Sequence, residues 1–340
     1  MGLNEKFFKS ADEDEPFFNT VLYPGSGDTT NGQSITGVGF EPDLVWIKSR
    51  NDSYNNVIYD SINGVNSAIS SNLTDAAWAN RNRFESFDLD GFTIEADNSG
   101  DLWKIDRENT TYVAWCWKAG GAAVSNTDGD VQSNVSANVA NGFSIVKGTG
   151  SGSGVQTVGH GLNSAPELVL VKNINVSDNW WVYSSTTGVS KYLELNTSAA
   201  TANWFENMVV NSTEIGVRQD STGSWGNLIA YCFHSVAGVS KVGSYIGNGN
   251  ANGPVVPLGF EPAWVMIKGT DEVSDWIIID NKRDTTNPNS ARLDANGNGA
   301  EYNGEDIMDL DSTSFQLKTS SASKNAIGKT FIYLAFAVEI

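Results

Sequence analysis

The sequence is poor in the residues on which many chemical sites depend. Its 340 residues include only 2 cysteines, 2 histidines and 4 methionines. So few thiols argue against a disulfide-rich scaffold, and so few thiols and imidazoles leave little for a zinc site. We therefore expect a fold that is held together by a hydrophobic core rather than by cross-links.

Positive charge and long apolar runs are also scarce. The chain has 21 Lys and Arg against 40 Asp and Glu, a net charge of −19 that would repel a phosphate backbone. No stretch approaches the roughly 18 apolar residues of a membrane-spanning helix. Residues 1–16 carry an acidic run and lack the basic and apolar regions of a signal peptide. We expect no nucleic-acid partner and no membrane span.

Glycine, aromatic residues and small polar residues are abundant instead. There are 34 glycines, 11 tryptophans and 15 phenylalanines, while charged residues make up only 18% of the chain. This composition is typical of strands and turns. Helical periodicity is weak, and the best segment, residues 74–87, predicts one or two turns at most. The sequence therefore predicts an all-β protein.

Three segments of the chain share the same landmarks in the same order. The run GFEPDLVWIK at 39–48 is matched by APELVLVK at 165–172 and by GFEPAWVMIK at 259–268. Each segment also contains an earlier strand that enters a Gly-x-Gly turn and, later, an aromatic strand. The apolar residues before each lysine do not alternate with polar ones, which indicates a strand covered on both faces. The chain is predicted to form three tandem antiparallel β-sandwich repeats, jelly-roll or lectin-like in style.

These landmarks predict the domain boundaries. We expect an N-terminal arm at 1–16, repeats at 17–120, 142–238 and 240–340, and a linker at 121–141 with at most one short edge strand. Each repeat closes with one more strand, YVAWCW, LIAYCF or YLAFAV. Cys116 and Cys232 occupy the same position of this strand, where the third repeat is expected to have Ala337. A position that alanine can fill favours a small core residue over a disulfide.

The ordered landmarks resemble a repeat family of unknown function found in tail-fibre and other structural proteins of marine bacteriophages. The runs that carry the resemblance include GFEPDLVWIK, VGHGLNSAPELVLVK, GSYIGNG and GFEPAWVMIK, and it extends from about Phe17 to Glu339. It implies a virion location, other virion proteins as partners, and a host surface glycan or receptor as ligand. The short N-terminal arm, without a long shaft, raises the alternative of a head-decoration, cement or accessory-fibre protein. The resemblance implies no catalytic residue.

Tryptophans in polar loops are the candidate ligand-binding residues, because a sugar ring can lie on an indole while nearby amides and carboxylates bond its hydroxyls. The candidates are Trp78, Trp103, Trp204 and Trp225. Five other tryptophans occupy strand positions that the sister repeats fill with apolar residues, and we expect these in the core: Trp46, Trp115, Trp117, Trp264 and Trp276.

One loop satisfies a calcium-binding pattern. Asp294, Asn296 and Asn298, with Gly299 and then Glu305, match the ligand positions of an EF-hand loop. No amphipathic helices flank this loop, and it falls where each repeat has a polar loop after the aromatic strand. Two interpretations stay open, a calcium site and an Asn/Gly-rich turn. No other cofactor is expected.

Catalysis has no recognisable residues. His160 and His234 lie in different elements, and no Ser or Cys nucleophile accompanies either in a known pattern. We therefore expect a protein that is not an enzyme, either a host-recognition protein or a purely structural one. A homotrimer is common among fibres, but three covalent repeats could instead supply a pseudo-threefold unit from one chain.

Overall fold

The computed structural model describes residues 16–28, 30–79, 83–96, 101–150, 154–204, 207–218 and 227–338. Its named strands pair in an antiparallel manner, and the all-β prediction is confirmed. The helix in these ranges is the single turn α1 (Ala322–Asn325). The described parts of the segment 74–87 contain β6 (Trp78–Ala79) and the start of β7 (Phe84–Asp88), and none of these parts forms the helical turns predicted there. Apart from Pro16, the N-terminal arm lies outside the described residues.

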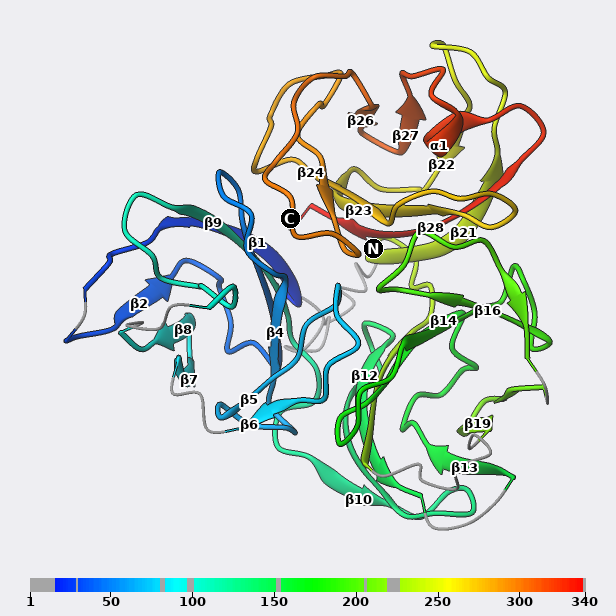
Figure 1. The fold of residues 1–340 in the computed structure, drawn as a ribbon. Helices are drawn as coiled ribbons and strands as arrows, with labels where there is room; N and C mark the ends of the chain where they lie inside the picture. Colours follow the sequence, from blue (N-terminus) through cyan, green and yellow to red (C-terminus); the bar gives the residue numbers. More distant parts are fainter. Residues whose placement is uncertain are drawn as a thin grey trace, which may run out of the picture.

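The first unit, residues 17–120, forms a larger inner sheet and a three-stranded outer sheet (Figure 1). The inner sheet has the order β1 (Phe18–Pro24), β9 (Thr111–Trp117), β3 (Leu44–Ser49) and β4 (Val57–Asp60). The outer sheet has the order β2 (Gln33–Thr36), β8 (Gly91–Ile94) and β7. A separate two-stranded pair joins β5 (Ser67–Ala68) to β6. Side chains from the facing inner and outer sheets share one buried cluster.

The second unit, residues 121–235, repeats this order. Its inner sheet has the same central order and is extended by two edge strands: it runs β10 (Val124–Asn126), β11 (Ser133–Asn138), β12 (Phe143–Thr149), β20 (Asn227–Phe233), β14 (Leu168–Asn173), β15 (Trp180–Ser184), β16 (Lys191–Glu194) and β17 (Ala202–Asn203). Its outer sheet runs β13 (Val155–Gly159), β19 (Glu214–Arg218) and β18 (Val209–Val210).

The third unit, residues 236–338, repeats the order again. Its inner sheet runs β21 (Ser240–Ile246), β28 (Thr330–Ala337), β23 (Pro262–Gly269), β24 (Ile277–Asp280) and β25 (Leu293–Asp294). Its outer sheet runs β22 (Val255–Pro257), β27 (Ser314–Leu317) and β26 (Met308–Asp311). The jelly-roll or lectin-like assignment stays a prediction.

The inner sheets of the three units meet at the centre of the molecule (Figure 1). One large buried cluster contains Trp46, Trp115 and Trp117 of unit 1, Trp180 of unit 2, and Trp264 and Trp276 of unit 3. The five tryptophans expected in the core are therefore buried. Each inner sheet packs on its own outer sheet with one face and on the other two units with the other face. This explains why the apolar runs of the inner strands do not alternate with polar residues.

The three seams between units use equivalent hydrogen bonds. A backbone amide of one unit donates to a backbone carbonyl of the next at each seam, in the pairs Ala77 N to Ile174 O (2.9 Å), Thr201 N to Thr270 O (2.8 Å) and Glu301 N to Arg50 O (2.6 Å). The last pair joins unit 3 to unit 1, and we call that contact the closing seam. The units thus form a closed ring with pseudo-threefold symmetry within one chain.

The strand pairing corrects one detail of the repeat alignment. Val45 lies opposite Cys116, Val169 opposite Cys232, and Val265 opposite Ala335. The third repeat therefore places Ala335 at the cysteine position, two residues before the Ala337 expected there. Strand β28 is apolar at consecutive positions, and a shift by two residues keeps every side chain on the same face, so both alignments fit the pattern. Both cysteines are buried and unpaired, as a small core residue would be.

The segment 121–141 also differs from the linker expected there. It contains β10 (Val124–Asn126) and β11 (Ser133–Asn138), and β11 pairs with β12 along the edge of the inner sheet of unit 2. The physical reason is that small side chains fill the inward positions of β11. Ser133 and Ser136 are buried beside Val135, so the strand carries little hydrophobic periodicity.

Candidate functional site: a cleft at the closing seam

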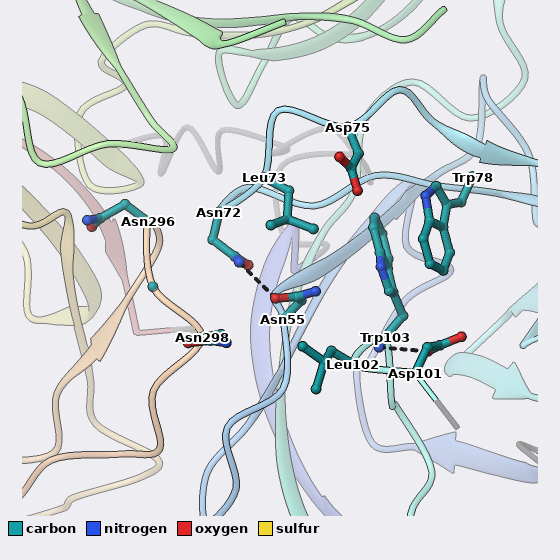
Figure 2. A pocket seen from close by; sticks show the side chains of 11 residues that line it. Asn55, Asn72, Leu73, Asp75, Trp78, Asp101, Leu102, Trp103, Asn296 and Asn298 are labelled. Atoms are coloured by element: carbon teal, nitrogen blue, oxygen red, sulfur yellow. Dashed lines mark hydrogen bonds between the residues drawn. The ribbon is translucent and has the colours of Figure 1, made fainter. Parts of the chain in front are cut away.

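An open cleft of about 570 Å³ lies where unit 3 meets unit 1. Three segments of unit 1 and one loop of unit 3 contribute to it. Its lining residues are Asn55, Asn72, Leu73, Asp75, Trp78, Asp101, Leu102 and Trp103 from unit 1, and Asn296, Gly297 and Asn298 from unit 3. Figure 2 shows two stacked tryptophans on one side of the cleft and a group of asparagines on the other.

The tryptophan wall is rigid. The rings of Trp78 and Trp103 stack with centroids 4.3 Å apart and planes at 21°. Trp103 is buried, and its backbone amide donates to Asp101 Oδ1 at 2.9 Å. Arg83 holds the same segment, because its guanidinium bonds Asp101 Oδ2 at 2.6 Å and the carbonyl oxygen of Trp103 at 2.5 Å. The partly exposed Trp78 therefore rests on a fixed second ring.

The asparagine wall joins the two units. Asn72 Nδ2 donates to Asn55 Oδ1 at 2.9 Å, and Asn72 Oδ1 accepts from the amide of Asn56 at 2.8 Å. Asn56 Nδ2 then reaches across the seam to the carbonyl oxygen of Gly297 at 2.8 Å. The loop of unit 3 is thereby fixed against unit 1, with Asn298 exposed beside it.

The pair formed by Asn72 and Asn55 recurs in every unit. In unit 2, Asn196 Oδ1 accepts from the backbone amide of Trp180, and Asn196 Nδ2 donates to Asn179 Oδ1. In unit 3, Asn296 Oδ1 accepts from the backbone amide of Trp276, and Asn296 Nδ2 donates to Asp275 Oδ1. We call this arrangement the asparagine clamp. The sequence alone did not indicate this clamp, because asparagine is frequent throughout the polar loops. Only the spacing to the aromatic strand, the same in units 1 and 2, could have pointed to it.

Trp204 does not line the cleft. Trp204 lies in unit 2, where its ring packs against the rings of Trp181 and Tyr192, with centroid distances of 5.3 and 4.7 Å. Trp225 lies outside the described residues. Of the predicted tryptophans, the structure brings together Trp78 and Trp103. Trp103 is 3% exposed, so it supports the binding wall and Trp78 presents the accessible surface.

Arginine and lysine side chains approach the carboxylates of the proposed calcium loop. Arg292 bonds both carboxylate oxygens of Asp294, and Asn296 acts in the asparagine clamp. Glu305 accepts from Lys324 and Thr319, and these bonds lower the pKa of Glu305 although its burial acts to raise it. Among the described residues, no group of three His, Cys, Asp or Glu side chains could hold a metal ion. The calcium hypothesis stays a prediction, and an EDTA-sensitive melting temperature would support it.

The histidines and cysteines occupy structural positions. Leu162 N donates to Nδ1 of the buried His160, whose Nε2 lies 3.1 Å from the carbonyl oxygen of Asn211. Burial lowers the pKa of His160, and it raises the pKa of the Cys232 thiol to about 12. A buried thiol with a raised pKa is a poor nucleophile. Within the described residues, no helix is long and apolar enough to cross a membrane.

Comparison with known proteins places the whole chain in one family. The chain belongs to the family described as Domain of unknown function (DUF7483), whose profile matches residues 13–339. No match was found among curated proteins or among solved structures. The family description names no activity, so the function is inferred from the cleft itself.

Proposed function

We propose that this protein is a bacteriophage virion surface protein, of the tail-fibre or receptor-binding type, that recognises glycans of the host envelope. The observation that carries the proposal is the cleft at the closing seam. It combines a partly exposed indole that is fixed from behind with amide and carboxylate groups beside it. This is the combination that sugar binding requires. The virion setting comes from the resemblance of the repeated runs to phage structural proteins.

The proposed mode of binding is non-catalytic. A pyranose ring would lie with its C–H face on Trp78, and its hydroxyls would bond groups such as Asp75 and Asn298. Because the indole of Trp78 already stacks on Trp103, which Asp101 holds through its backbone amide, little conformational entropy is lost on binding. The histidines and cysteines take no part in this proposal, because His160 and both cysteines are buried away from the cleft and none of the four residues lines it.

The experiment compares two tryptophan variants for binding to host cells and to immobilised host glycans. We expect Trp78→Ala to weaken binding about tenfold to a hundredfold, roughly 1–3 kcal/mol, because it removes the accessible face of the cleft. Trp204→Ala is the matched control, because it truncates a partly exposed tryptophan outside the cleft. Both variants are first checked for an unchanged fold by circular dichroism.

The location of the protein on the particle completes the test. Immunogold labelling at the tail, together with binding that depends on Trp78, would support the proposed function. A label spread over the capsid lattice, with no detectable binding to host cells or glycans, would contradict it. The head-decoration or cement function would then take its place.

A further inference from the structure

We propose that the cleft takes an uncharged sugar residue and rejects sugars that carry a carboxylate, sulfate or phosphate. This inference rests on the proposed function and specifies the ligand class. The side chains that line the cleft supply four amides, two carboxylates, two indoles and two leucines. None of these residues is a lysine or an arginine. A site that selects acidic sugars needs a cation within hydrogen-bond reach of the ligand.

The nearby cations are already engaged. Arg83 pairs with Asp101 at 2.6 Å and bonds the carbonyl oxygen of Trp103. Lys172 is buried and donates to the carbonyl oxygens of Thr74 and Asn173 at 3.1 and 2.8 Å. Lys172 is close enough to interact with the charge of Asp75, but its ammonium group donates to backbone carbonyl oxygens, so an anionic sugar would meet the carboxylate of Asp75 without a cation directed at the ligand. The net charge of −19 adds a repulsive field over the whole surface.

Neutral hydroxyls have suitable partners in the same cleft. The carboxylate of Asp75 accepts hydrogen bonds, and the amide of Asn298 both donates and accepts. Asp75 is partly exposed and Asn298 is exposed, so both are accessible to a ligand. Within the described chain, neither side chain forms a hydrogen bond. A hydroxyl of a neutral sugar can satisfy both groups, whereas an acidic substituent satisfies only the amide.

The pseudo-threefold symmetry limits the number of such sites. The position of Trp78 in β6 corresponds to Ala202 in β17, because the two strand pairs have the same register. Counting from the asparagine clamp places the exposed Tyr302 at the corresponding position of unit 3. Only unit 1 therefore combines an indole at this position with a second indole behind it. We expect one such binding site per chain.

A glycan array with matched neutral and acidic members tests the ligand class. The probes are neutral hexose and N-acetylhexosamine oligosaccharides, and their counterparts with uronic acid, sialic acid or sulfate. We expect the full-length protein to bind a neutral member at least tenfold more tightly than its acidic counterpart, with one site per chain by calorimetry. Asp75→Asn should reduce that preference severalfold. Asp128→Asn, an equal charge change at an exposed site in unit 2, should leave it unchanged.

The outcomes separate this inference from the proposed function. Equal or tighter binding of acidic glycans, still lost in Trp78→Ala, would overturn the inference about ligand class and leave glycan recognition standing. A preference for neutral over acidic members that does not change in Asp75→Asn would overturn the role of that carboxylate. Absence of binding to every glycan on the array and to host cells would overturn the proposed function and this inference together.

Discussion

A buried lysine stands at the same position of each unit. Lys48, Lys172 and Lys268 lie at the ends of equivalent inner strands and are fully buried. Each ammonium group donates to backbone carbonyl oxygens, including those of Ser49, Asn173 and Ser274. Burial disfavours the charged form and lowers the pKa of Lys48 to about 7 and those of Lys172 and Lys268 to about 8. Three charges are thus placed where water cannot solvate them.

These lysines predict a pH dependence of stability. The pKa of Lys48 is lower in the folded protein than the ordinary value of 10.5, so between these values the unfolded chain binds more protons. The free energy of unfolding should therefore rise with pH from about 7, and for Lys48 alone by about 1.5 kcal/mol between pH 7 and pH 8.5. Lys48→Met should remove this increment, as measured by urea denaturation at both pH values.

The control for this prediction is a lysine that stays in water. Lys191→Met changes an exposed side chain in β16 and should keep the pH dependence of the unmodified protein. Comparing variants at the same pH cancels the contribution of the two cysteines, whose raised pKa values act in the opposite direction. If Lys48→Met kept the full rise in the free energy of unfolding between pH 7 and pH 8.5, burial would not disfavour the charged form of Lys48, and the prediction would be wrong.

At the scale of elements, the asparagine clamp ties each aromatic strand to the loop that follows the next strand. In unit 2, Asn196 Oδ1 accepts from the buried amide of Trp180 at 2.8 Å, and Asn196 Nδ2 donates to Asn179 at 2.9 Å. The loop then reaches the neighbouring unit, where Ser198 O accepts from Lys268 at 3.1 Å. The clamp therefore positions the segments that form the seams.

Removing one clamp should destabilise the fold without touching the cleft. Asn196→Ala leaves the amide of Trp180 buried without a partner, which costs about 1–3 kcal/mol. We expect a lower midpoint in urea and an unchanged affinity for the glycan. Asn303→Ala, at an exposed loop position of unit 3, should leave the midpoint unchanged. A midpoint for Asn196→Ala equal to that of the control would show that the clamp contributes nothing.

Much of the order of the strands could be predicted from the sequence. The features that could not be predicted were missed for physical reasons. The runs ending in Lys48, Lys172 and Lys268 are apolar at every position because both faces of the inner sheet are covered. The edge strands β10 and β11 were predicted only as a linker with at most one short strand, because serines fill two of the three buried positions of β11. The cleft could not be predicted as a unit, since Trp78 and Asn298 are far apart in the chain. Only closure of the ring brings them together.

At the scale of the whole molecule, the closing seam differs from the other two. Units 1 and 2, and units 2 and 3, follow each other in the chain, whereas units 3 and 1 do not. At the closing seam Arg50 bonds Glu301 with two hydrogen bonds of 2.9 Å, and Arg283 bonds the same carboxylate at 3.2 Å. The residues equivalent to Arg50 and Glu301 at the other seams are uncharged. The charged pair thus strengthens the one seam that lacks a peptide connection.

The closing seam should therefore open first when this pair is broken. Glu301→Gln keeps the backbone amide that bonds Arg50 O but leaves Arg50 and the buried Arg283 without their shared carboxylate. We expect the free energy of unfolding to fall by about 2 kcal/mol, because the partly exposed Arg50 loses its carboxylate partner while Arg283 keeps Asp280. Hydrogen exchange should accelerate at residues 299–303 more than at the equivalent segments 75–79 and 199–203. Glu261→Gln, at an exposed position of unit 3, should change neither quantity.

An equal acceleration of hydrogen exchange at all three seams would mean that the pair stabilises the molecule as a whole and does not close the ring. Protection restored at 299–303 by a neutral glycan would show that a ligand in the cleft also holds units 3 and 1 together, since both contribute to its walls.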